Sequence, residues 1–86
     1  MKVIRFEEGK KYYMTFPCDV SLVYFYDVTR RTENYVFLVD ADGKTIKRKV
    51  QVQSENRCEV CRPLGKYAMS PVLKATDVYN MIVHSL

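Results

Sequence analysis

Residues 22–53, LVYFYDVTRRTENYVFLVDADGKTIKRKVQVQ, decide the fold. The stretch contains three runs rich in valine, isoleucine, tyrosine and phenylalanine, which suit a pleated, half-buried surface. A charged connector at residues 30–34 separates the first run from the second, and the turn Asp40-Ala41-Asp42-Gly43 separates the second from the third. The stretch therefore predicts a meander of three antiparallel strands, with the rest of the chain packed around it.

The turn at Asp40 to Gly43 determines which side chains share a face of that meander. A type I turn followed by a glycine bulge makes a three-residue loop, with Gly43 left-handed and Asp40 opposite Lys44. A two-residue Asp42-Gly43 turn is the alternative, because an aspartate-glycine pair suits both turn types. It would shift the register by one residue and move every side chain to the other face. We favour the bulged turn and keep the shorter one as the alternative.

The bulged turn predicts a face that is aromatic on one strand and basic on the next. That face would carry Tyr35, Phe37 and Val39 beside Thr45, Lys47, Lys49 and Gln51. The opposite face would carry Val36, Leu38, Ile46, Arg48, Val50 and Val52. With the shorter turn, the aromatic side chains would instead join the apolar face, and Val36 and Leu38 would lie beside the lysines.

Six residues around this hairpin are the candidate binding residues: Tyr35, Phe37, Lys47, Lys49, Arg30 and Arg31. Small barrels bind single-stranded nucleic acid by stacking a base on an exposed ring and contacting phosphate with lysine. Exposed tyrosine, phenylalanine and arginine are also favoured anchors of protein interfaces. The structural alternative is that the lysines are solvated side chains and the C-terminal tail covers the rings.

Further strands are expected on both sides of the meander. The expected strands are residues 11–16, ended by Pro17, then 22–29 after a loop at 17–21, 35–39, the third strand of the meander up to residue 53, 57–62, and an edge strand at 67–75 interrupted by Pro71. Residues 1–11 would form a short strand or an extended arm. We predict a mainly all-β domain at residues 1–75, a small open SH3-like barrel of five or six antiparallel strands, with an OB-like arrangement as the alternative.

Residues 76–86 would form a C-terminal tail. Thr76 or Asp77 can cap a short helix, and the apolar residues at 78, 79, 82 and 86 have helical spacing. Such a helix would pack on the barrel and cover the aromatic side chains.

Charge and composition narrow the class of protein. Fourteen Lys and Arg against ten Asp and Glu give a net charge of +4, which favours anionic partners without identifying one. No apolar run has the length of a signal-peptide core or of a membrane span. The expectation is a cytoplasmic protein that does not engage a membrane, with its three cysteines reduced.

The residues that carry metal or catalytic chemistry are few. Cys58-Glu59-Val60-Cys61 has the spacing of half a zinc knuckle or of a redox pair. Only Cys18 and His84 remain as further zinc ligands, and Cys58 and Cys61 would point to opposite faces of a strand. Buried or incidental thiols are the better interpretation. His84 is three positions from the end of the sequence, a poor place for a catalytic base. We therefore predict no metal site, no cofactor, no catalytic residue and no enzyme.

At scattered positions the chain resembles a group of short uncharacterised proteins from mobile elements and phages of gut Firmicutes. The matching residues are Phe6, Glu7, Gly9, Lys10, Tyr12, Cys18, Asp19, Arg31, Thr32, Pro63, Gly65, Tyr67, Met69, Ser70, Pro71, Val72 and Ala75. The resemblance covers roughly residues 5–75, and the tail at 76–86 departs from it. It implies a mobile-element origin and carries no activity.

Together these patterns predict a small interaction module without enzymatic activity, an accessory or inhibitor protein of a mobile element or phage that binds a protein partner. The alternative is a protein that binds single-stranded or structured nucleic acid through the basic and aromatic face. The edge strand near Pro71 leaves both a monomer and a dimer open.

Overall fold

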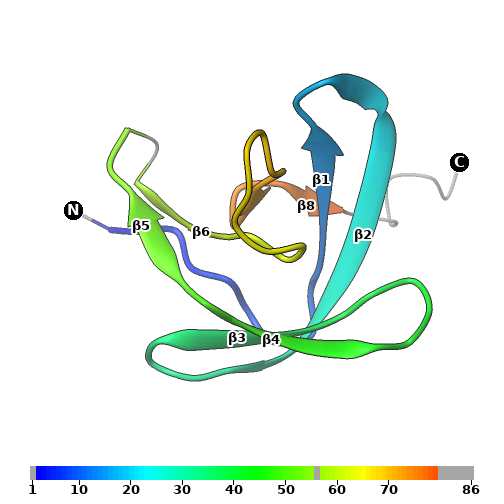
Figure 1. Cartoon of the computed structure of the whole chain (residues 1–86). Coiled ribbons are helices and arrows are strands. Elements are labelled where there is room, and N and C mark those ends of the chain that lie inside the picture. The colour runs from blue at the N-terminus through cyan, green and yellow to red at the C-terminus, as the bar shows by residue number, and fades with distance from the viewer. Residues whose placement is uncertain (1, 56, 80–86) are drawn as a thin grey trace, which may run out of the picture.

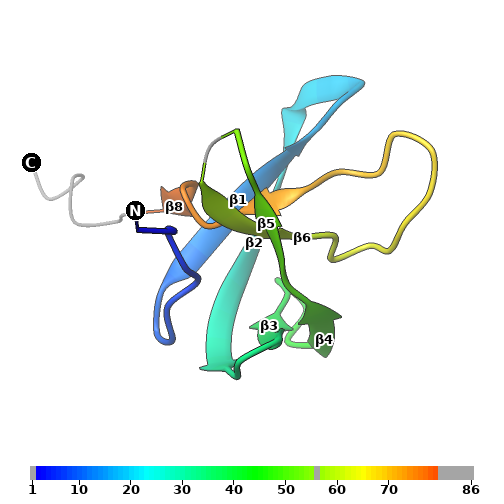
Figure 2. The same ribbon diagram turned by 90° about the vertical axis from the view of Figure 1, so that its left-hand side faces the viewer.

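The computed structural model describes residues 2–55 and 57–79, which form eight strands in two antiparallel sheets. The larger sheet has the order β4-β3-β2-β1-β8 and the smaller one β5-β6-β7 (Figures 1 and 2). The strands are β1 (Lys11–Phe16), β2 (Asp19–Arg31), β3 (Tyr35–Val39), β4 (Thr45–Lys49), β5 (Gln51–Gln53), β6 (Cys58–Cys61), β7 (Leu73–Lys74) and β8 (Val78–Tyr79). No helix occurs among these residues, so none there could cross a membrane.

The all-β prediction is confirmed, although the strand count is eight in the described residues rather than five or six. The expected third strand of the meander divides at Val50. Its first part, β4, pairs with β3, and its second part, β5, pairs with β6 in the other sheet. Figure 1 shows the chain passing directly from β4 into β5. No ladder joins the two sheets into a closed cylinder in this part of the chain, so the open SH3-like barrel stays a prediction.

The bulged turn between β3 and β4 is confirmed. Tyr35 pairs with Lys49, Phe37 with Lys47, and Val39 with Thr45. The Asp40 N–H donates to the Lys44 carbonyl at 3.0 Å, and Gly43 has a φ of +82°, which a side chain would oppose. The Asp40 carboxylate also accepts hydrogen bonds from the backbone N–H groups of Asp42 and Lys44, each at 2.9 Å. This turn fixes the register, and therefore the two faces, of the hairpin.

The core lies between the two sheets and the N-terminal arm. It consists of Phe6, Tyr12, Met14, Tyr26, Val28, Val36, Leu38, Cys58, Cys61, Leu73 and Ala75. Val36 and Leu38 are fully buried, and Ile46 and Val50 pack against the core, as the register predicts. Val52 was expected on the same face but is 57% exposed. The reason is the change of partner at Val50: β5 follows the second sheet and no longer continues the inward face of β4.

The predicted C-terminal helix is wrong where the structure describes the tail. Val78 and Tyr79 form β8, which pairs with Lys11 and Tyr12 of β1. The Tyr79 ring packs edge-on against Phe25, with 5.0 Å between ring centroids. Because β8 and β4 lie at opposite edges of the sheet, this part of the tail covers Phe25 and not the aromatic side chains of β3. Residues 80–86, where the rest of the predicted helix falls, lie outside the described residues.

Two further boundaries differ from the sequence prediction. The expected loop at 17–21 is shorter, because β2 begins at Asp19, whose carboxylate accepts hydrogen bonds from the backbone and hydroxyl of Ser21. The expected strand at 67–75 is reduced to β7, because the segment before it turns: the Ser70 N–H donates to the Tyr67 carbonyl, and Met69 has a φ of +60°. The long β1–β2 hairpin extends away from β3 and β4 (Figures 1 and 2).

The buried Tyr26 phenol and Cys61 thiol predict that the folded protein loses stability at high pH. Burial raises the pKa of the Tyr26 phenol from 10.0 to about 12, and that of the Cys61 thiol from 9.0 to about 12. Both groups hold their protons more tightly when the chain is folded. Their contribution to the free energy of unfolding is therefore fully present at neutral pH and is lost as the pH rises from about 9 toward 12. For Tyr26 the loss corresponds to about 2 to 3 kcal/mol of unfolding free energy.

Guanidinium unfolding under reducing conditions, at pH steps from 8 to 11.5, measures this effect. We expect the unfolding free energy to fall above pH 9, and the Tyr26→Phe variant to lose less of it than the unsubstituted chain. A free energy that is constant to pH 11.5 would contradict the assignment.

Candidate functional site

A β-bulge in β2 decides which of the two adjacent arginines, both predicted for one face, points outward. Val28 pairs with Leu38 of β3, but Arg30 pairs with Phe37 and Arg31 with Val36, so Thr29 is the extra residue. Without the bulge, Arg30 would share the inward face of Val28, because side chains alternate along a strand. The extra residue reverses the alternation, sending Arg30 outward beside Phe37 and Arg31 inward beside Val36.

The outward side chains form a cation–aromatic cluster consisting of Arg30, Tyr35, Phe37 and Lys47. Arg30 of β2, Phe37 of β3 and Lys47 of β4 are direct cross-strand neighbours. The Arg30 guanidinium carbon lies 5.6 Å from the centroid of the Phe37 ring. The Lys47 Nζ lies 4.3 Å from the centroid of Tyr35 and 5.7 Å from that of Phe37. The structure thus brings together four of the six predicted binding residues on one exposed surface.

The cations of this cluster form no ion pair with the carboxylates of the described residues. The ion pairs of the described residues join Arg5 and Arg31 to Glu59, Lys10 to Glu7, and Lys11 to Asp27, and none includes Arg30 or Lys47. Their only charge-related contacts there are with the rings. An exposed cation–π contact is worth about 0.5 to 1 kcal/mol, whereas a base stacked on an aromatic side chain contributes about 1 to 3 kcal/mol. The contact between Lys47 and Tyr35 is therefore weaker than the stacking of a planar ring on Tyr35.

Arg31, the fifth predicted residue, does not belong to this surface, and its prediction as a face residue is wrong. Its side chain is 8% exposed and forms a bidentate ion pair with Glu59 of β6, whose side chain is 7% exposed. Arg31 Nε donates to Glu59 Oε1 at 3.2 Å, and Arg31 Nη2 donates to Oε2. The same arginine donates through Nη1 to the Tyr35 carbonyl at 3.3 Å. The role of Arg31 in the structure is to join β2 to the second sheet.

Glu59 also holds the N-terminal arm. Its Oε1 accepts a hydrogen bond from the Phe6 N–H at 3.0 Å, and Oε2 lies 3.5 Å from Arg5 Nε. Its backbone N–H donates to the Ile4 carbonyl at 2.8 Å. The carboxylate is thus satisfied on both oxygens, which a buried charge requires. Composition alone did not single out Glu59; the only signal was a charged residue inside the apolar run at 58–61.

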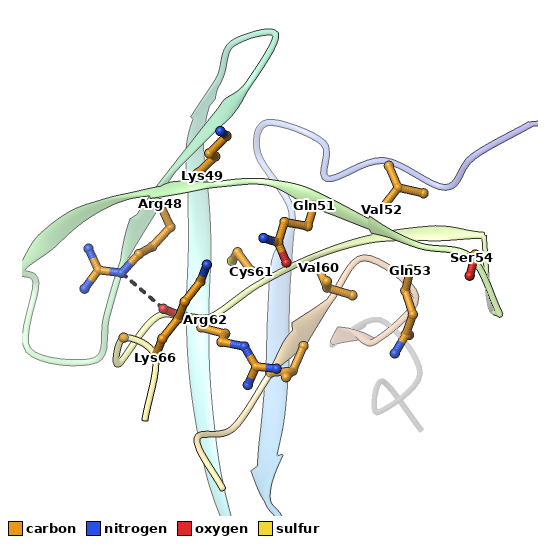
Figure 3. Close-up of a pocket in the computed structure, with 12 residues that line it drawn as sticks. Arg48, Lys49, Gln51, Val52, Gln53, Ser54, Val60, Cys61, Arg62 and Lys66 are labelled. Carbon is orange, nitrogen blue, oxygen red and sulfur yellow. Dashed lines mark hydrogen bonds between the residues drawn. The ribbon is translucent and has the colours of Figure 1, made fainter. Parts of the chain in front are cut away.

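Lys49, the sixth predicted residue, lies between the cluster and a second basic region. It is exposed and pairs with Tyr35 across the β3–β4 ladder. It also lines a cavity of about 510 Å³ formed by β4, β5, β6 and the loop that follows β6. Figure 3 shows Arg48, Arg62 and Lys66 on one side of the β4–β5 backbone, with Lys49 on the other side. Lys49 therefore connects the two surfaces.

An apolar surface at the far end of the β1–β2 hairpin was not predicted. The first seven residues of β2 are all exposed, and Val20 reaches 76%. Leu22 and Tyr24 are 41% and 39% exposed, and the Tyr24 ring packs edge-on against Phe16 at 5.0 Å. The available signal was the apolar character of both faces at the start of residues 22–29. An exposed apolar surface of this kind is typical of protein interfaces.

The cysteines occupy two different environments. Cys58 and Cys61 are buried in the core, whereas Cys18 is exposed in the turn between β1 and β2. With its pKa raised to about 12 by burial, Cys61 remains a thiol at neutral pH and is a poor nucleophile. No three His, Cys, Asp or Glu side chains come together in the part of the chain that the structure describes, and His84 lies outside it.

Comparison with protein-family models, curated proteins and solved structures finds no match to this chain.

Removal of either partner of the Arg31–Glu59 pair should strongly destabilise the fold. Glu59→Gln leaves a buried guanidinium without its counter-charge, and Arg31→Ala leaves a buried carboxylate. Each should lower the unfolding free energy by about 3 to 5 kcal/mol. Arg31→Lys should also destabilise, because a lysine cannot form the bidentate contact. Urea unfolding followed by circular dichroism measures these changes.

Arg30→Ala is the matched control, because it removes the neighbouring cation from the exposed face. It should lower the unfolding free energy by no more than about 1 kcal/mol, the value of its exposed contact with the Phe37 ring. Equal effects of Arg30→Ala and Arg31→Ala would contradict the inward and outward placement of the two arginines.

Proposed function

We propose that this protein is a small interaction module without enzymatic activity, built on an open SH3-like barrel, that binds single-stranded nucleic acid through the cation–aromatic cluster. The observation that carries the proposal is the row formed by Arg30, Phe37 and Lys47 across three adjacent strands, with Tyr35 beside it. The sequence alone favours a protein partner, with nucleic acid as the alternative. Geometry supports nucleic acid instead, because the cations and the rings lie on one exposed surface.

Each side chain of the cluster would contact a different part of the nucleic-acid strand. Tyr35 and Phe37 offer ring faces on which bases stack, a contact that every base can make. Arg30 and Lys47 stand on either side of Phe37, two strand spacings or about 10 Å apart, and contact phosphates on both sides of a stacked base. Lys49, also on the edge strand β4, adds a further positive charge next to Tyr35. This arrangement binds without reading a defined sequence.

Resemblance to proteins of mobile elements supports a cytoplasmic accessory role in such an element. In that setting the protein would meet single strands produced during transfer or replication of the element. This assignment of origin is part of the proposal and is independent of the binding chemistry.

Binding of a fluorescent twelve-residue oligo-dT strand tests the proposal. Arg30→Ala combined with Lys47→Ala should weaken binding at least tenfold at low salt. It should also reduce the slope of log affinity against log salt by about 1 to 1.5, because each phosphate contact on a single strand contributes about 0.7. Lys44→Ala is the matched control, since Lys44 is exposed in the neighbouring turn and outside the cluster. It should change affinity less than twofold.

Absence of binding by the unsubstituted protein at 50 mM salt, or equal losses in the double variant and in Lys44→Ala, would contradict the proposal.

A protein partner is the second candidate, and the exposed apolar end of the β1–β2 hairpin favours it. Val20, Leu22 and Tyr24 present apolar side chains that the described residues leave uncovered. Binding at this surface would change little with salt, unlike binding at the cluster. Salt dependence therefore separates the two candidates. The surfaces lie at different ends of the sheet, so one protein can carry both.

A further inference from the structure

The cavity beside β4 and β5 is lined by several cations. Arg48, Lys49, Arg62 and Lys66 contribute to its lining, and none of the described lining residues is an aspartate or glutamate. The volume is about 510 Å³, which is within the range of small-molecule sites. The cations come from two separate segments: β4 and the loop that follows β6 (Figure 3). The fold therefore concentrates positive charge around one concavity.

Both arginines are held in place by neutral backbone groups. Arg48 Nε donates to the carbonyls of Arg62 at 3.2 Å and Pro63 at 3.1 Å, and its Nη1 donates to the Lys47 carbonyl at 2.9 Å. Arg62 Nη1 donates to the carbonyl of Ser70 at 3.0 Å and to its hydroxyl at 2.8 Å. Carbonyls and hydroxyls orient a guanidinium without neutralising it. Each arginine has five N–H donors, so each retains donors for a ligand.

The positive charge of this cavity favours an anionic ligand. Arg48, Arg62 and Lys66 lie on the same side of the β4–β5 backbone, where like charges repel one another. None of the described carboxylates offsets them by an ion pair. Half-buried, pre-oriented guanidinium groups pair well with phosphate, because the planar fork matches its oxygens. A single carboxylate carries one negative charge, whereas a terminal phosphate or a chain of phosphates carries two or more. The multiply charged phosphate is the better complement.

We propose that the cavity binds a multiply charged phosphate group, with Arg48 and Arg62 as fixed donors and Lys66 as a mobile point charge at its rim. The source of the group is either the terminal phosphate of a nucleic-acid strand or a free phosphate chain. Lys49 contributes to the cavity lining and pairs with Tyr35 of the cation–aromatic cluster across the β3–β4 ladder, so a strand with a terminal phosphate would reach from one surface to the other past Lys49. The site itself does not depend on strand binding at the cluster.

Calorimetric titration with inorganic tripolyphosphate tests the site. We expect saturable binding to the unsubstituted protein, and a loss of at least tenfold in Lys66→Glu, a change at an exposed residue. Lys44→Glu is the matched control, because it makes the same change of net charge outside the cavity, and it should retain affinity within about threefold.

Arg48→Gln is a second variant, whose folding is checked by circular dichroism; its affinity for tripolyphosphate should also fall at least tenfold. No binding by the unsubstituted protein, or equal losses in Lys66→Glu and Lys44→Glu, would overturn the proposal.

Two further comparisons separate this site from the cluster and identify the source of the phosphate. The Arg30→Ala and Lys47→Ala double variant should bind tripolyphosphate within twofold of the unsubstituted protein, and a tenfold loss there would overturn the separate site. If the natural ligand is a strand end, 5′-phosphorylated oligo-dT should bind more tightly than 5′-hydroxyl oligo-dT, and Lys66→Glu should remove the difference. Equal affinity of the two strands, with tripolyphosphate binding retained, assigns the site to a free phosphate chain.

Discussion

The ion pair between Arg31 and Glu59 is the interaction on which the arrangement of this protein depends. It joins β2 of the larger sheet to β6 of the smaller one, and Glu59 also receives the N–H of Phe6 from the N-terminal arm. A buried carboxylate without a partner would be strongly unfavourable, so β2 must turn Arg31 inward. The bulge at Thr29 does this, and the same reversal turns Arg30 outward beside Phe37. The exposed cation–aromatic cluster is therefore a consequence of the buried pair.

Positive charge and exposed apolar surface occupy different parts of the molecule. The cations of β4, together with Arg62 and Lys66, surround the edge where the chain passes from one sheet to the other. Apolar side chains such as Val20 gather at the far end of the β1–β2 hairpin. Carbonyl groups, rather than carboxylates, hold Arg48 and Arg62. Because its charge is oriented but not neutralised, this edge is suited to an anionic ligand, while the hairpin is suited to a protein surface.

Local chemistry made part of the fold predictable. Pro17 ended β1 where expected, and the Asp40 to Gly43 turn fixed the pairing of Phe37 with Lys47, because an aspartate and a left-handed glycine specify a loop length. The placement of Arg31 was not predictable in this way, since alternation along a strand gives no sign of a bulge and its partner Glu59 is 28 residues away. Helical spacing at the C-terminus was misleading, because pairing with β1 makes Val78 and Tyr79 a strand.

The most direct measurement of the central claim is an NMR titration of the isotope-labelled protein with short oligo-dT at low salt. We predict that the amide shifts of Arg30, Tyr35, Phe37 and Lys47 change most and saturate together. The amide shift of Glu59, which lies in the interior and donates to the Ile4 carbonyl, should change little. Saturating changes confined to Val20, Leu22 and Tyr24 on the hairpin, or no saturating change at all, would contradict the claim that this sheet face binds a nucleic-acid strand.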